Sequence, residues 1–171
     1  MRTLAVLMLL AAAAVADVES GPKPDAAVPE LKVTFATGTN EGKEVNVPGE
    51  RKDEPTVYLF VNSGKFSRPV GRFLKVLDEK IGDANGKAHA YAVWVGADAE
   101  KTNDYLPKVN ESMKFTKTDL AWTKTATPEG WGLNDDAHLT VVVTKGKKVF
   151  KVFAWVSVSE KDVPKVLEAV K

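Results

Sequence analysis

Two apolar, β-prone runs separated by one amphipathic helix constrain the fold more than any other feature of the sequence. Residues 56–61 (TVYLFV) and 91–95 (YAVWV) are almost continuously apolar, which is typical of strands buried on both faces. Between them, apolar side chains recur at helical spacing from Val70 to Ile81, and Gly82 follows as a stop signal. A strand, a helix and a second buried strand predict a right-handed parallel crossover. We therefore expect an α/β fold with residues 56–61 in the middle of the sheet.

A shorter pair of strands is expected ahead of this unit. Apolar and polar residues alternate over residues 31–35, and a glycine-containing turn at residues 38–42 separates them from the β-prone residues 45–47. Alternation of this kind is typical of strands with one buried face. We expect an N-terminal β-hairpin that extends the sheet.

A second helix is expected after residues 91–95. Asp98 is placed to cap it, and apolar side chains recur on one of its faces. Pro107 lies inside this pattern, and an internal proline costs a helix about 3 kcal/mol. The sequence therefore predicts either a helix kinked at Pro107 or a helix that begins near Asn103 or Asp104 with the proline in its first turn.

The last third of the chain predicts a hairpin and a closing helix. Residues 139–144 and 148–155 are β-rich and are joined by a Lys-Gly-Lys turn, whose glycine suits the positive φ of a tight turn. Residues 159–162 (SEKD) form a near capping box for the closing helix. Ahead of the hairpin, residues 120–123 are a candidate strand, and residues 127–129 (TPE) have the cap and first-turn proline of a brief helix.

No cysteine occurs among the 171 residues. Disulfides, thiol catalysis, cysteine-ligated zinc, iron–sulfur clusters and a lipoprotein anchor are therefore excluded, because each requires a cysteine sulfur. Two histidines, His89 and His138, leave little metal chemistry, and we expect no cofactor.

Among the 24 Lys and Arg residues only Arg2 lies in residues 1–16, so the others equal the 23 acidic residues in number. Zero net charge without that segment argues against a nucleic-acid or anionic-membrane binder.

The N-terminus has the layout of a secretory signal peptide. Arg2 precedes an apolar run over residues 4–14, and residues 14–16 (AVA) form a small-x-small cleavage site. A transmembrane anchor is the alternative, but the run is shorter than the roughly 20 residues that span a bilayer. We expect cleavage after Ala16, an extended leader over residues 17–29, one domain over residues 30–171, no stable membrane insertion after cleavage, and a periplasmic or extracellular location.

The segment after the first buried strand carries the most specific pattern in the chain. The strand ends near Phe60, residues 67–70 (SRPV) open the helix, and residues 77–79 (LDE) lie further along it. This order resembles that of thioredoxins, in which a strand is followed by Cys-Gly-Pro-Cys at the start of a helix that later reads Leu-Asp-Glu. The likeness covers roughly residues 29–171. It implies a thioredoxin-like fold, in its exported peroxiredoxin or thiol-disulfide-reductase form, with a central mixed β-sheet flanked by helices.

The resemblance also indicates which residues stand at the redox positions. Ser67 falls on the nucleophilic cysteine, Pro69 is retained, and Val70 falls on the resolving cysteine. Serine cannot replace the thiol, because its hydroxyl neither ionises near neutral pH nor forms a mixed disulfide. The simplest role of Ser67 is to cap the helix. We therefore expect a domain without the redox catalysis of the family.

The second hallmark of the family is a cis-proline that faces the motif. Residues 131–139 (WGLNDDAHL) resemble the corresponding stretch, but the proline position falls on Ala137 or His138. In the family, the groove between this loop and the motif helix binds extended polypeptide, so the resemblance implies a protein- or peptide-binding module. We expect Trp131 to be partly exposed in the groove. The expected groove residues are Ser67, Arg68, Pro69, Val70, Trp131, Ala137 and His138.

Other functions stay open at this stage. A serine-dependent hydrolase would use Ser67 as nucleophile and His138 as base, oriented by an aspartate of residues 135–136, although the chain has no Gly-x-Ser-x-Gly elbow. A purely structural envelope protein would need no site. A metal site would combine His138 with residues 135–136, or use Asp98 and Glu100, although such turn residues cap helices more often than they bind metals.

Two surface features complete the candidates. The lysines at the tip of the C-terminal hairpin are expected to be solvated and to protect the sheet edge, with an acidic partner surface as the alternative. They are Lys145, Lys147, Lys148 and Lys151. Residues 110–112 (NES) fit a glycosylation sequon.

Overall fold

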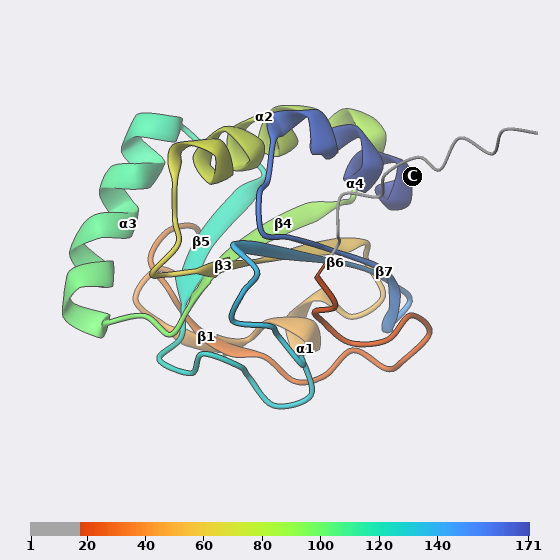
Figure 1. The fold of residues 1–171 in the computed structure, drawn as a ribbon, viewed down its shortest axis with the longest axis horizontal. Helices are drawn as coiled ribbons and strands as arrows, with labels where there is room; N and C mark the ends of the chain where they lie inside the picture. The colour runs from red at the N-terminus through yellow and green to blue at the C-terminus, as the bar shows by residue number, and fades with distance from the viewer. Residues whose placement is uncertain (1–17) are drawn as a thin grey trace, which may run out of the picture.

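A computed structural model describes residues 18–171, and the expected signal peptide at residues 1–16 lies outside this range. The described chain forms one mixed seven-stranded sheet in the order β2-β1-β5-β4-β3-β6-β7 (Figure 1). Its elements are β1 (Lys32–Phe35), β2 (Glu44–Asn46), α1 (Val47–Arg51), β3 (Thr56–Asn62), α2 (Arg68–Ala84), β4 (His89–Val95), α3 (Ala99–Met113), β5 (Thr118–Trp122), β6 (Leu139–Lys145), β7 (Lys148–Trp155), η1 (Glu160–Asp162) and α4 (Val163–Val170).

The centre of the sheet is parallel and its margins are antiparallel. β3 pairs in parallel with β4, so α2 is the crossover that the two apolar runs predict. β4 also pairs in parallel with β5, and α3 is a second crossover. β6 pairs antiparallel with β3, and β7 with β6. The expected N-terminal hairpin is β1 with β2, and it adds to the sheet beyond β5. The sheet therefore confirms the α/β class and the hairpin extension.

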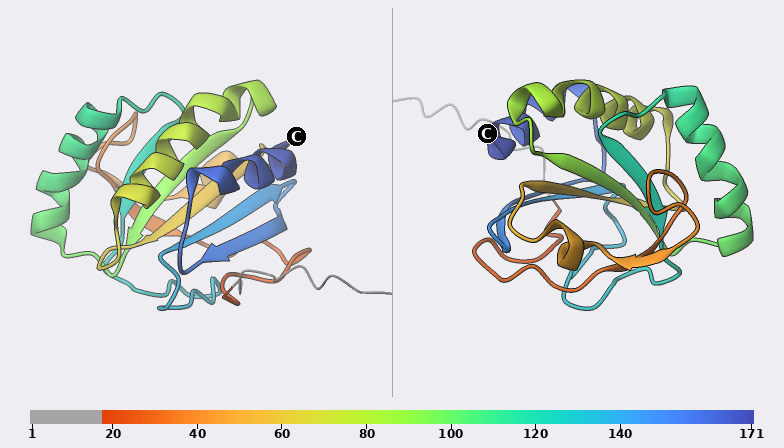
Figure 2. Two further views of the ribbon diagram at one scale, coloured as in Figure 1. Left: turned by 45° about the horizontal axis from the view of Figure 1, so that its top comes forward. Right: turned by 180° about the vertical axis from the view of Figure 1, so that it is seen from behind.

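Each face of the sheet has its own hydrophobic core. The face covered by α2, α3 and α4 contains the fully buried Phe73, Leu77 and Leu106. The opposite face contains Tyr58, Phe60 and Trp131, and it is covered by the N-terminal segment, α1 and the β5–β6 loop, on the far side of the sheet from α2, α3 and α4 (Figure 2). Because β3 and β4 are covered on both faces, their apolar residues are nearly continuous. No helix within residues 18–171 is long and apolar enough to cross a bilayer.

The segment expected as an extended leader lies against the domain over residues 18–29. The Asp25 amide donates to the Val149 carbonyl at 2.8 Å, and the Val149 amide donates to the Ala26 carbonyl at 2.9 Å. Nearer the N-terminus, the hydroxyls of Ser20 and Thr140 are 2.7 Å apart and buried. The bonds to Val149 cover part of the otherwise free edge of β7, where an unpaired strand would invite association.

Two local expectations need correction. α3 begins at Ala99, where Asp98 Oδ1 accepts from the Lys101 amide at 3.1 Å, so the later start is wrong and Pro107 lies inside the helix. The brief helix expected at residues 127–129 is absent: the Trp131 amide donates to the Pro128 carbonyl in a single turn, and Gly130 then takes a φ of +80°. A positive φ at this position ends helical geometry after that turn. The expected capping box of Ser159 with Asp162 is present.

Candidate functional site

The start of α2 places three of the expected site residues at the surface. Ser67 is the N-cap residue with extended backbone, Arg68 and Pro69 are exposed in the first turn, and Val70 is fully buried beneath them. The Ser67 hydroxyl makes no capping bond, so the expected cap is absent although the position is correct. Gly71 follows, and a Cβ there would lie 3.0 Å from Met113 Cε, so a larger residue would press on the end of that side chain.

The side of this site that faces the β5–β6 loop is closed. Asn62 Nδ2 donates to the Asp135 carbonyl at 3.1 Å, and the ammonium of Lys65 donates to the same oxygen. Ala137 is 4% exposed, and the void that it lines with Asn62 has a volume of about 10 Å³. No cis peptide bond occurs within residues 18–171, including Ala137 and His138. The Ala137 side chain is therefore buried and is not presented to an open groove.

Trp131 contradicts the expected exposure most clearly. Its side chain is fully buried, its Nε1 donates to the Glu30 carbonyl at 2.9 Å, and its ring lies 5.1 Å from the Tyr58 ring and 4.7 Å from the Phe60 ring. The indole therefore fills the core of the second sheet face. The glycines beside it turn the loop at the surface while the side chain points inward.

The opposite side of the α2 N-terminus is open and aromatic. A hollow of about 360 Å³, the aromatic cleft, lies between the β3–α2 loop and the first turns of α3. Phe66 packs at a ring distance of 5.2 Å from Trp94 and meets Tyr105 edge-on at 6.3 Å. Tyr105 is 45% exposed. The lining residues are Ser63, Gly64, Phe66, Trp94, Gly96, Asp98, Lys101, Thr102 and Tyr105.

The aromatic cleft lies at the carboxyl ends of the parallel strands β3 and β4, where open α/β sheets bind their ligands. Its rim carries both signs of charge, from Asp98 and Lys101. The signal that could have revealed it is Tyr105, a large aromatic residue at the edge of the apolar face of the residue 99–113 helix. Phe66, directly before Ser67, is the second such signal.

The structure gives little support to the serine-hydrolase and metal-site hypotheses. The Ser67 hydroxyl and the His138 ring make no hydrogen bond to each other or to any other side chain of residues 18–171. His138 instead contributes its backbone, donating to the Trp155 carbonyl at 2.8 Å and accepting from the Asn62 amide at 3.2 Å. Within the same residues, no group of three His, Asp or Glu side chains could hold a metal ion.

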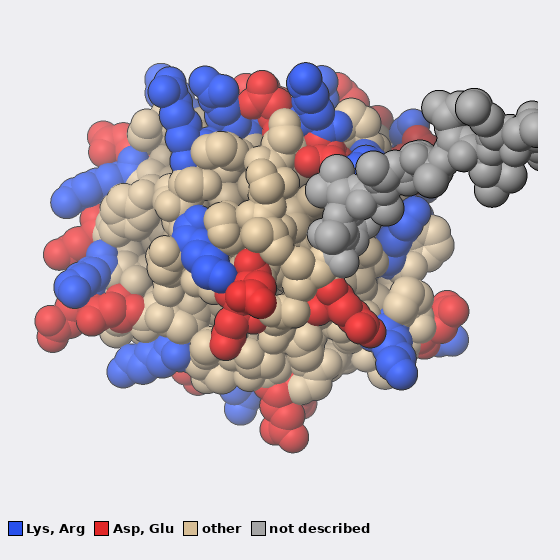
Figure 3. Space-filling view, in the orientation of Figure 1, with Lys and Arg blue, Asp and Glu red and all other residues tan. Residues whose placement is uncertain are grey.

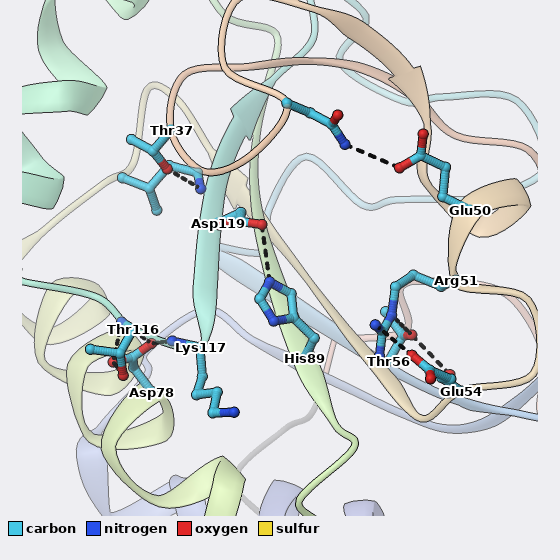
Figure 4. A network of polar contacts seen from close by, with 12 residues as sticks. Thr37, Glu50, Arg51, Glu54, Thr56, Asp78, His89, Thr116, Lys117 and Asp119 are labelled. Atoms are coloured by element: carbon cyan, nitrogen blue, oxygen red, sulfur yellow. Dashed lines mark hydrogen bonds and ion pairs between the residues drawn. The ribbon is translucent and has the colours of Figure 1, made fainter.

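The second histidine and Asp78 belong to a polar network along β4 and β5 (Figure 4). His89 Nε2 lies 3.0 Å from Asp119 Oδ2 across the two strands. Asp78, the aspartate of the Leu-Asp-Glu sequence, is 3% exposed and accepts from the amides of Thr116 and Lys117 at 3.0 and 2.8 Å. Asp78 therefore fixes the chain that enters β5, which is a structural role.

Two lysines of the β6–β7 hairpin lie close to aromatic rings, and a third pairs with the N-terminal segment. The Lys145 ammonium lies 4.3 Å from the centre of the Phe150 ring, and that of Lys151 lies 5.4 Å from the Phe153 ring. Lys148 forms an isolated bridge with Ala27. On the face of the molecule shown in Figure 3, basic and acidic side chains are interspersed. The sequon at residues 110–112 lies within α3.

Comparison with known proteins identifies the fold of this chain. No family model matches the sequence, and no curated protein is similar to it in sequence. Among solved structures, a putative thiol:disulfide interchange protein DsbE from Chlorobium tepidum superposes with a TM-score of 0.63 and 15% identity, covering 88% of this chain and 99% of that one. The chain has the thioredoxin-like fold.

Two further structures carry the same fold at low identity. Peroxidoxin BcpB from Mycobacterium tuberculosis superposes with a TM-score of 0.62 and 15% identity, covering 87% of this chain and 96% of its own. A DsbF homologue from Corynebacterium diphtheriae gives a TM-score of 0.61 and 18% identity, covering 85% and 87%. This thioredoxin-like chain has no cysteine, so Ser67 and Val70 stand at its α2 N-terminus without any thiol.

Proposed function

We propose that this chain is an exported thioredoxin-like domain that has no redox catalysis and binds an extended segment of a partner protein. The observation that carries the proposal is the aromatic cleft beside the α2 N-terminus. This cleft lies at the carboxyl ends of β3 and β4, while the residues that would perform thiol exchange are absent.

The chemistry of the aromatic cleft suits a protein segment. Tyrosine and tryptophan are enriched in the energetic centres of protein interfaces, where a large rigid ring removes much apolar area from water. Tyr105 is such a ring, half exposed and supported from behind by Phe66. An extended segment fits a hollow that lies between a loop and a helix. Asp98 and Lys101 on the rim offer one charge of each sign, which favours a mixed polar sequence over a polyanion.

The residues assigned to the interface differ from those of the expected groove. Ser67, Arg68 and Pro69 keep their place because they are at the surface beside the aromatic cleft. Phe66 and Tyr105 replace Trp131 and Ala137, whose side chains are buried, and the buried Trp94 supports Phe66 from below. A hydrolase based on Ser67 and His138 gains no support, because no contact links the two side chains in residues 18–171.

Panning of a random peptide library against the protein tests the binding function. Enriched peptides are expected to lose at least about ten-fold in affinity, or about 1.4 kcal/mol, for the Tyr105→Ala variant. Phe150→Ala is the matched control, since Phe150 is a similarly exposed aromatic residue on β7. A library that yields no enriched peptide, or peptides that bind Tyr105→Ala as well as the parent chain, would contradict the proposal.

Export rests on the pattern of residues 1–16 and has its own test. Fusion of residues 1–29 to a reporter that is active only outside the cytoplasm should give activity, and N-terminal sequencing of the product should begin at Asp17. Replacing Leu9 and Leu10 by Asp interrupts the apolar run and should abolish export. A reporter that stays inactive with the natural segment would refute the assignment.

A further inference from the structure

A second pocket lies at the opposite end of β3 from the aromatic cleft. This α1 pocket has a volume of about 480 Å³, within the roughly 300–1,000 Å³ range of small-molecule sites. It is formed by segments far apart in the sequence: the N-terminal residues near Val28, helix α1, the start of β3 and the β6–β7 turn at Lys147. The aromatic cleft adjoins the other end of β3, next to Ser63.

A buried tyrosine without a hydrogen-bond partner forms part of the wall of the α1 pocket. Tyr58 is 1% exposed, its ring packs against Tyr91 at 6.2 Å and Trp131 at 5.1 Å, and its hydroxyl makes no hydrogen bond to residues 18–171. Burial raises the pKa of Tyr58 far above its ordinary value, so the hydroxyl stays protonated and remains a donor. Within residues 18–171 only Thr118 Oγ1 is fully buried without a partner, so the Tyr58 hydroxyl reaches the pocket and is free to donate to a ligand there.

A second donor lies in the same wall. Asn46 lines the pocket, and its Oδ1 accepts from the Leu31 amide at 3.1 Å. That bond fixes the side-chain amide and leaves Asn46 Nδ2 without an acceptor in the described chain. Two neutral donors with no acceptor of their own favour a ligand group that only accepts, which is the property of a carboxylate.

The charged residues that line the α1 pocket favour a ligand with one negative charge. Arg51 is fully engaged in the wall: its guanidinium bonds Thr56 Oγ1 at 3.1 Å, the Pro55 carbonyl at 3.2 Å and Glu54 at 2.7 Å, as Figure 4 shows for Thr56 and Glu54. Lys52 and Lys147 are exposed lining residues with no ion pair to residues 18–171, and Glu30 is the one lining carboxylate. The unpaired charges therefore leave one net positive charge, which suits a monoanion rather than a phosphate dianion.

We propose that the α1 pocket binds a small organic acid with an apolar body and one carboxylate. The apolar body packs against Val28, Pro48 and the Tyr58 ring. The carboxylate accepts from the Tyr58 hydroxyl and the Asn46 amide and lies near the ammonium groups of Lys52 and Lys147. Hydrogen bonds to a charged acceptor are stronger than those to a neutral one, so the charge contributes to selectivity as well as affinity.

NMR titration of the protein with 2-naphthoate tests this site, with 2-naphthamide and 2-naphthylmethylamine as neutral and cationic analogues. Naphthoate is expected to bind with a Kd below about 1 mM, to shift the amides of Gly49, Thr56 and Thr144, and to bind at least about ten-fold tighter than either analogue. No saturation by naphthoate near 1 mM, or equal binding of the amine, would overturn the proposal. Tighter binding of a peptide that ends in a tryptophan carboxylate would overturn the assignment to a free small acid.

Matched variants locate the binding. Tyr58→Phe keeps the ring and is expected to weaken naphthoate about ten-fold or more, whereas Tyr91→Phe, on a ring that stacks on Tyr58 but does not line the pocket, should have no effect. Lys147→Ala should weaken binding and reduce its salt dependence, whereas Lys148→Ala, one residue further on, should not. Unchanged affinity in both Tyr58→Phe and Lys147→Ala would refute the site. A failure here leaves the peptide-binding proposal standing, since Tyr105 lines a different hollow.

Discussion

Replacement of Trp131 by alanine tests whether this residue belongs to the hydrophobic core or to a binding site. Its side chain is fully buried between the rings of Tyr58 and Phe60, and removal of a buried Trp costs about 3–5 kcal/mol. Loss of the bond from Nε1 to the Glu30 carbonyl adds about 1 kcal/mol. The expected loss of unfolding free energy is therefore about 4–6 kcal/mol, a large part of the roughly 5–15 kcal/mol of a typical domain.

Urea denaturation followed by far-ultraviolet circular dichroism measures this loss without relying on tryptophan fluorescence. Trp131→Phe should lose less, because the ring volume is partly kept and only the indole bond is removed. Tyr105→Ala is the control, since exposed side chains usually change stability by less than about 0.5 kcal/mol. A loss below about 1 kcal/mol for Trp131→Ala would refute the placement of this indole in the core.

Three further predictions follow from particular contacts. Asp78→Ala leaves the part-buried amides of Thr116 and Lys117 without their acceptor and should cost about 1–3 kcal/mol in urea denaturation. Glu79→Ala removes only the exposed pair with Lys75 and should cost less than about 0.5 kcal/mol, so equal effects would contradict this. Burial raises the pKa of Tyr91 from 10.0 to about 12, so its contribution to the stability of the fold is complete below pH 10.0 and is lost as the pH rises through about 12. The loss of stability at alkaline pH should therefore be smaller in Tyr91→Phe. A variant with the same stability profile against pH as the parent chain would contradict this assignment. Ser67→Cys with Val70→Cys should form a disulfide across the first turn of α2, detected by thiol titration, and a pair that stays reduced under oxidising conditions would count against that geometry.

Most secondary structure could be predicted from the sequence because its signals are local. The apolar runs at residues 56–61 and 91–95 are strands because both faces are covered, and the 3.6-residue period marks α2. The thioredoxin-like order followed from these elements and from the few residues around Ser67. α3 shows the limit of propensity, because Pro107 is accommodated inside a helix that begins at Ala99.

The sites were harder to predict because they are assembled from distant segments. Trp131 is next to glycines in the sequence, which suggests a surface loop, yet its partner Glu30 lies 101 residues away. The aromatic cleft needs Phe66 and Trp94 to meet Tyr105 from three separate elements. No local pattern reports such a meeting, so the resemblance to thioredoxins pointed to the α2 N-terminus but not to Phe66 or Tyr105.

The most direct test of the peptide-binding account is chemical-shift mapping of a panned peptide on the ¹⁵N-labelled protein. The account predicts the largest amide shifts at residues 63–68 and 98–105, which surround the aromatic cleft, and small shifts along β7. The same peptide should shift these amides much less in Tyr105→Ala at equal concentration. Shifts centred on residues 131–138, on β7, or spread evenly over the domain would contradict the account.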